Sequence, residues 1–125
     1  MRSYGESLCK ELIEIVIINN RYFKDISNLV LTLLVNTRPK SLYGLELDFY
    51  IPELKLGIEF RGQQHYRYTP DFFRTNSSFV KRILYDVQKD LLCKKEKILL
   101  VRLNATELNP ENFRRCIREN LKRFP

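Results

Sequence analysis

Besides Glu53, the segment Leu45–Tyr66, "LELDFYIPELKLGIEFRGQQHY", contains three carboxylates and the only histidine of the chain. The acids are Glu46, Asp48 and Glu59, and His65 follows them. Like charges on one side of a small hairpin repel each other unless a cation offsets them. In proteins, Mg²⁺ is held by one or two carboxylates together with waters and substrate phosphates. These residue types therefore predict a site at which a divalent cation activates water and stabilises charge on a phosphate.

A β-hairpin is predicted to position these acids. Apolar and polar residues alternate over Leu45–Ile51, and the alternation resumes after Pro52-Glu53, which predicts two strands joined by a two-residue turn. Asp48 and Glu59 are then diagonal neighbours about 7–8 Å apart on one face, where one ion can bridge them. The alternative is a hairpin whose outer face is only solvated, with Glu46 as a solvated neighbour. The expected pairs are Ile51 with Leu54, Asp48 with Gly57, and Glu46 with Glu59. Because Gly57 has no side chain, it would leave room for the ion beside Asp48.

Two segments, "LDFYIPELKLGIEFRGQQHY" and "YDVQKDLLCKKEKILLVRL", resemble the very-short-patch-repair branch of the PD-(D/E)XK nucleases. Within this branch the chain is most similar to phage and viral homing-type endonucleases with an E-D-x-H-D active site, and the similarity extends from about Tyr4 to Leu103. The resemblance implies a restriction-endonuclease-like α/β fold. Its core would be α-β-β-β-α-β, with a mixed central sheet flanked by helices and a C-terminal helix added. It also implies a Mg²⁺- or Mn²⁺-dependent endonuclease that hydrolyses phosphodiester bonds of DNA.

The same resemblance implies which side chains are catalytic and which hold the metal. Asp48 and Glu59 would hold the ion, and His65 would assist proton transfer, because imidazole titrates near neutral pH. Ordinary structural roles are the alternatives: a helix-capping glutamate, a surface histidine and a solvated helix aspartate. The implied catalytic residues are Glu6, Asp48, Glu59, His65 and Asp86.

Substrate binding is expected from side chains near the acids and from the last helix. Gln64 matches the family glutamine before the histidine. Arg61 stands where the wider superfamily has lysine, and Tyr85 stands where an arginine is usual. Arginine cannot act as a general base because it does not lose its proton in proteins, but it can hold a phosphate oxygen. A basic group near the C-terminus would lie along DNA phosphates or would only keep the surface soluble: Arg114, Arg115 and Arg118.

The charge distribution favours a polyanionic partner. The net charge is +7, and residues 66–125 carry the surplus with 14 basic and 7 acidic side chains. We expect double-stranded DNA, with specificity supplied by loops, by a homodimer or by another protein. The alternatives are a catalytically inactive nuclease-fold module that binds nucleic acid, and a nuclease that acts on RNA. The apolar runs are too short to span a bilayer, so no membrane association is expected.

Element boundaries follow from periodicity, and the 125 residues suggest one domain, 1–125. The three cysteines, Cys9, Cys93 and Cys116, are expected to be free buried thiols in an intracellular, reducing compartment. The resemblance to phage and viral endonucleases implies a protein encoded by a phage or virus. The segment Leu29–Val35 can be a strand or a short helix. The first helix is expected over about Tyr4–Asn19, with Leu8, Leu12, Ile15 and Val16 inward. The second is expected over about Ser77–Glu96, with Phe79, Ile83, Val87 and Leu91 inward. Lys97–Leu103 is expected to be a central strand, and a last helix should begin at Asn109-Pro110, with Phe113, Ile117 and Leu121 inward.

Overall fold

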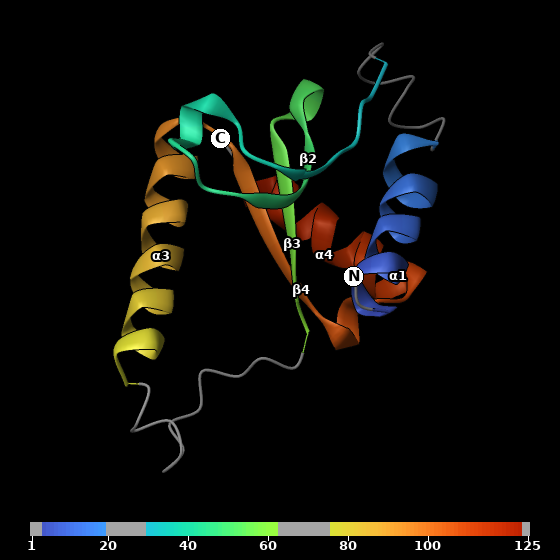
Figure 1. Ribbon diagram of the computed structural model, residues 1–125. Helices are drawn as coiled ribbons and strands as arrows, with labels where there is room; N and C mark the ends of the chain where they lie inside the picture. Colours follow the sequence, from blue (N-terminus) through green and yellow to red (C-terminus); the bar gives the residue numbers. More distant parts are fainter. Residues whose placement is uncertain (1–3, 20–29, 63–75, 124–125) are drawn as a thin grey trace.

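The computed structural model describes residues 4–19, 30–62 and 76–123 (Figure 1). Helix α1 comes first and continues into a wider π-helical stretch, η1. Short 3-10 turns join several of the later elements, and strand β4 lies between the last two helices. The elements are α1 (Tyr4–Ile13), η1 (Glu14–Ile18), β1 (Leu34–Thr37), β2 (Leu47–Ile51), β3 (Leu56–Gly62), α3 (Asn76–Lys95), β4 (Leu99–Asn104) and α4 (Pro110–Arg123).

The four described strands form one mixed sheet in the order β1-β2-β3-β4. The first three strands run antiparallel to their neighbours, whereas β4 pairs with β3 in parallel. Figure 1 shows α3 on one side of the sheet and α1 with α4 on the other. An α/β fold with a mixed sheet between helices is therefore confirmed.

The larger apolar core lies between the sheet and the helices α1 and α4. Phe49 and Ile51 from β2 and Ile58 from β3 pack there with Phe113 and Ile117 of α4. A smaller cluster lies on the α3 side and contains Leu42, Leu47, Cys93 and Ile98. Along β2, buried Phe49 and Ile51 alternate with Asp48 and Tyr50, which are only partly covered.

The predicted hairpin register is wrong by two residues. Ile51 pairs with Leu56 and Tyr50 pairs with Gly57, so neither Leu54 nor Asp48 has the expected partner. The cause is a longer connection: Pro52–Leu54 form a 3-10 turn, and Lys55 follows it with φ of 50°, in the left-handed region. Gly57 makes room for core packing, since a methyl there would lie 3.2 Å from a Leu47 methyl carbon and 3.3 Å from one of Leu100.

The positions of the helices are predicted correctly, but the inward faces of two of them are not. In the first helix Leu12 and Val16 are buried, while Ile15 is 62% exposed. In α3, Ile83, Val87 and Leu91 are all exposed, and the buried residues include Lys89 and Cys93 instead. The final helix agrees with its prediction at Phe113 and Ile117, and the Asn109 side chain accepts the Asn112 backbone N–H as an N-cap.

Strand β4 lies at the edge of the described sheet rather than at its centre. Its apolar composition has another cause: β4 contacts α3 on one side and α4 on the other, so both of its faces are covered. In the ambiguous segment Leu29–Val35, residues Leu34 and Val35 belong to β1. Among the described helices, none is both long and apolar enough to cross a membrane.

Candidate active site

Asp48 is the second residue of β2. Phe49 pairs with Ile58 on β3, and the same register continued by one residue places Asp48 across from Glu59. One oxygen of Asp48 accepts the backbone N–H of Phe60 at 3.1 Å, so the side chain reaches over the neighbouring strand. Asp48 and Glu59 therefore meet at the same level of the sheet, as direct rather than diagonal neighbours.

The electrostatic surroundings of Asp48 disfavour its charged form. Burial raises the pKa of Asp48 above its usual range, and the negative charges of Glu59 and Glu6 raise it further. The hydrogen bond from Phe60 and the charge of Lys89 act in the opposite direction and offset only part of this increase. The negative charges of Glu6 on α1 and Glu59 on β3 thus both act on Asp48 of β2. A cation bound to Asp48 would offset this repulsion.

Glu6 comes close to this point because α1 packs tightly against the end of β3. Gly5 lies under the ring of Phe60: a Cβ atom at residue 5 would be 2.2 Å from Cε1 and 2.4 Å from Cζ. Such distances are too short for any side chain, so only glycine permits this approach. The expected capping partner of Glu6, Ser3, lies outside the described residues. Glu6 itself is half-buried in the first turn of α1.

Glu59 is buried in a network of cations on the α3 side of the sheet. One oxygen accepts from the Lys89 amine, and both of these side chains are almost fully buried. The other oxygen lies 3.3 Å from Nε of Arg102, the neighbour of Glu59 across β3 and β4, and 3.8 Å from Arg61. Glu59 is thus surrounded by three positive charges, unlike Asp48.

Asp86 and Asp90 complete this network from α3. Asp86 pairs with Arg61 at 2.8 Å, and Asp90 pairs with Arg102. Asp86 therefore faces the sheet and is not the solvated aspartate of the structural alternative. The three cations and the three carboxylates balance in formal charge: Arg61, Lys89 and Arg102 against Glu59, Asp86 and Asp90.

Lys89 and Tyr85 are members of the site that sequence reasoning did not identify. The Tyr85 ring lies 4.8 Å from the Lys89 amine, and its hydroxyl accepts the backbone N–H of Glu46 at 3.2 Å. Tyr85, which stands where an arginine is usual, thus supports Lys89 and ties α3 to the start of β2. Glu46 pairs with Arg38 at 3.2 Å and takes no part in the network around Glu59.

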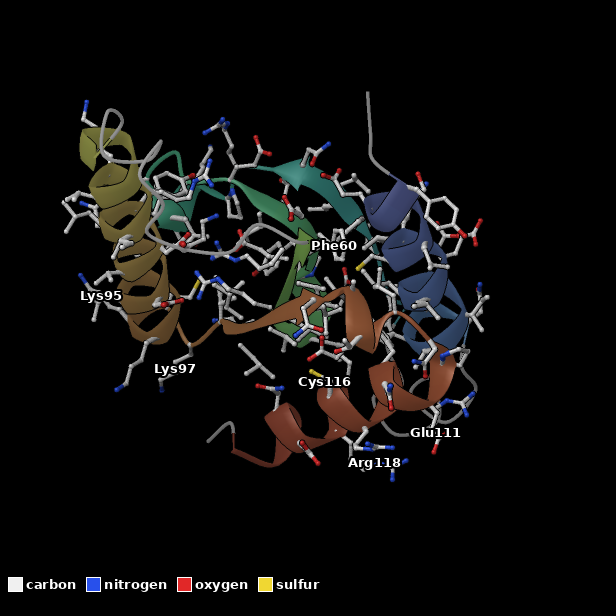
Figure 2. All side chains as sticks on the ribbon, turned by 90° about the horizontal axis from the view of Figure 1, so that it is seen from below. Phe60, Lys95, Lys97, Glu111, Cys116 and Arg118 are labelled. Carbon is white, nitrogen blue, oxygen red and sulfur yellow. The ribbon has the colours of Figure 1, made fainter. Side chains whose placement is uncertain are left out.

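Several predicted residues are not brought together with these acids. His65 and Gln64 lie outside the described residues, and their roles stay predictions. The arginines Arg114, Arg115 and Arg118 are exposed on α4. Figure 2 shows Arg118 on α4, well separated from Lys95 of α3. The sheet therefore separates the basic face of α4 from the network around Glu59.

A divalent cation fits Asp48 better than it fits Glu59. Two observations favour Asp48. Burial, with further contributions from Glu59 and Glu6, raises its pKa, and among the described residues no cation lies within ion-pair distance of it. Both oxygens of Glu59 are already engaged by cations. In the part of the chain that the structure describes, no group of three or more His, Cys, Asp or Glu side chains is arranged to hold a metal.

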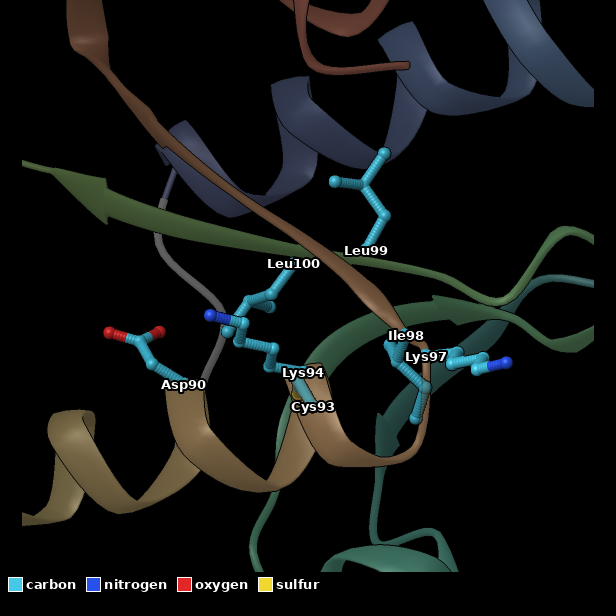
Figure 3. A pocket seen from close by; sticks show the side chains of 7 residues that line it. All are labelled: Asp90, Cys93, Lys94, Lys97, Ile98, Leu99 and Leu100. Atoms are coloured by element: carbon cyan, nitrogen blue, oxygen red, sulfur yellow. The ribbon is translucent and has the colours of Figure 1, made fainter. Parts of the chain in front are cut away.

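A hollow next to the network gives no alternative site. It lies between the last turns of α3 and the start of β4, and Ile98, Leu99 and Leu100 form much of its lining (Figure 3). Lys94 and Lys97 extend in opposite directions from it, so their amines do not converge on one anion.

The cysteines agree in part with the prediction of buried thiols. Cys9 and Cys93 are free and buried, and Cys116 is only half-buried. Burial, with a contribution from Asp48 and Glu6, raises the pKa of Cys9 to about 12, and burial raises the pKa of Cys93 to about 11. Both thiols are therefore protonated and unreactive near neutral pH.

Comparison with known proteins finds similarity to two viral proteins. The chain is 34% identical over 64 residues to "Uncharacterized protein 307L" of Invertebrate iridescent virus 6, which covers 51% of this chain and 32% of that relative. It is 29% identical over 63 residues to "Uncharacterized protein 033L" of Invertebrate iridescent virus 3, again with 32% of the relative covered. No protein-family model and no solved structure matches the chain. The matched part spans about a third of each relative, and their viral origin agrees with the prediction of a virus-encoded protein.

Proposed function

We propose that the protein is a metal-dependent endonuclease that hydrolyses phosphodiester bonds of DNA, with a PD-(D/E)XK nuclease core similar to that of the very-short-patch-repair branch. One observation carries the proposal: three acids from α1, β2 and β3 act on one point, and the central one, Asp48, has a raised pKa. Structural carboxylates are normally offset by cations of the protein, as Glu59 is. A carboxylate that is crowded by like charges instead is typical of a functional site.

In this proposal Asp48 holds Mg²⁺ or Mn²⁺, and Glu6 and Glu59 shape the site. The bound ion would activate water and stabilise the charge that develops on the phosphate. Lys89, Arg61 and Arg102 hold Glu59 in place beside Asp48 through their ion pairs. Arg61, although paired with Asp86, keeps 23% of its side chain exposed and can turn a guanidinium edge toward a phosphate. His65 is proposed to assist proton transfer.

A nuclease-fold module that binds nucleic acid without cleavage is the second candidate. The observation that favours it is the saturation of Glu59: the second acid is already neutralised by Lys89 and Arg102, which suits a purely structural network. In this case the basic half of the chain would bind the DNA backbone, and Asp48 would be a half-buried acid without a metal.

Cleavage of plasmid DNA by wild type and Asp48→Asn separates the two candidates. With Mg²⁺ or Mn²⁺, the wild type should nick or linearise the plasmid. Asp48→Asn should lower the rate by several orders of magnitude while DNA binding persists, because the substitution removes only the charge that holds the ion. A wild type that binds DNA but cuts with neither metal supports the binding module. Equal cleavage by both proteins contradicts the role of Asp48.

The stability of the same variant supplies the folding control. The pKa of Asp48 is higher in the folded state than its value of 3.8 in the unfolded chain. Between these two values Asp48 keeps its proton in the folded protein but has lost it in the unfolded chain. The free energy of unfolding therefore falls as the pH rises through this window. In metal-free buffer at pH 7, Asp48→Asn should be at least as stable as the wild type. Mg²⁺ at ten times its Kd should add about 1.4 kcal/mol to the wild type only.

A further inference from the structure

The outer face of α3 carries an unexpected row of exposed apolar side chains. The sheet side of this helix holds Lys89, Asp86 and Cys93, and the apolar residues point the other way. Figure 1 shows no described element beyond α3 on its outer side. The row consists of Val80 (45% exposed), Leu84 (58%), Val87 (47%) and Leu91 (62%), which we call the α3 seam.

The spacing within the α3 seam is that of a helix-to-helix contact. Its members follow one another at steps of four, three and four residues, the heptad pattern with which one helix packs against another. Lys89 occupies the heptad position that lies farthest from such a seam, and it is buried against the sheet. The pattern and the observed burial therefore agree on the direction in which the seam faces.

Charges beside the α3 seam favour a parallel copy of the same helix. In a parallel pair, Asp90 of one helix lies next to Lys95 of the other. The twofold symmetry of the dimer produces two such ion pairs, one on each side of the seam. Asp90 pairs with Arg102 through one oxygen and keeps 52% of its side chain exposed. In an antiparallel pair Lys81 would instead face Lys95, which is repulsive. We propose that the α3 seam is a dimerisation surface that takes α3 of a second copy of this chain in parallel.

The seam spans less than two heptads, so the dimer is expected to be weak and to depend on concentration. Sedimentation velocity from about 1 to about 200 µM should show a monomer–dimer equilibrium with a micromolar Kd for the wild type. The double variant Leu84→Lys/Leu91→Lys should raise this Kd by at least about tenfold, since two central anchors are lost. The matched control is Ile15→Lys, because Ile15 is as exposed as Leu91 (62%) but lies in η1.

A cross-linking variant tests the orientation. In a parallel pair the two copies of residue 84 face each other, so Leu84→Cys in a Cys116→Ser background should oxidise to a disulfide-linked dimer. Lys95→Glu should weaken the dimer by repulsion with Asp90.

A wild type that stays monomeric at the highest concentration, or a seam variant that dimerises like the Ile15→Lys control, overturns the proposal. Because the measurement uses neither DNA nor metal, it is independent of the proposed nuclease activity.

Discussion

Single residues divide the candidate site into two electrostatic environments. Asp48 is crowded by carboxylates, while Glu59 on the neighbouring strand is neutralised by Lys89 and Arg102. Alternation along the hairpin predicts the two strands that carry these acids, but the register that made Asp48 and Glu59 diagonal neighbours is wrong by two residues. Lys89 could not be identified in the same way, because a lysine within a charged helix looks like an ordinary solvated side chain. Its role depends on a partner thirty residues earlier, on another element.

Removal of Lys89 should destabilise the folded protein, because it leaves Glu59 buried without its closest cation. Lys89→Met deletes the cation but keeps the aliphatic stem, so the free energy of unfolding should fall by roughly 3 kcal/mol. Lys94→Met is the control, since Lys94 is exposed on the same helix and should change stability by less than about 0.5 kcal/mol. Adding Glu59→Gln to Lys89→Met should restore much of the loss. Urea denaturation of the four proteins measures this, and equal stability of both lysine variants would contradict the buried pair.

At the scale of elements, periodicity locates helices well but does not reliably identify their inward faces. The apolar row of α3 was expected to face the sheet, yet the sheet offers this helix Glu59 and Arg102, which require charged partners. Asp86 and Lys89 meet this need, and the apolar row turns outward. The hairpin register shows a similar limit: nothing in Pro52-Glu53 indicates that the connection extends to Lys55 in a left-handed conformation.

The contact between α1 and β3 depends on the absence of a side chain at residue 5. In an exposed helix, Gly→Ala normally stabilises by about 1 kcal/mol. Gly5→Ala should instead destabilise by about 1–3 kcal/mol, because the new methyl overlaps the Phe60 ring. Ser7→Ala, at an exposed position of the same helix, is the control. The pair Gly5→Ala/Phe60→Leu should recover stability in thermal unfolding, and a Gly5→Ala protein that gains stability would disprove the close packing.

At the scale of the whole molecule, the sheet separates the network around Glu59 from the exposed arginines of α4. The sheet lies between α3, with the network around Glu59, and α4, whose buried residues Phe113 and Ile117 leave the arginines outward. Composition predicted the basic half of the chain, but it could not predict on which side of the sheet the charges lie, since that depends on tertiary packing.

The salt dependence of DNA binding tests whether α4 contacts the backbone. Each lost phosphate contact should lower the slope of log K against log salt by about 0.9, so replacing Arg114, Arg115 and Arg118 by Ala should lower it by up to about 2.7. The matched control removes three exposed charges at the other side of the molecule, Lys94, Lys95 and Lys97. Fluorescence anisotropy with a short duplex at several salt concentrations measures both slopes. A larger decrease for the α4 variant places DNA on that helix. Equal decreases indicate a general charge effect, and an unchanged slope for the α4 variant leaves its arginines with a role in solubility alone.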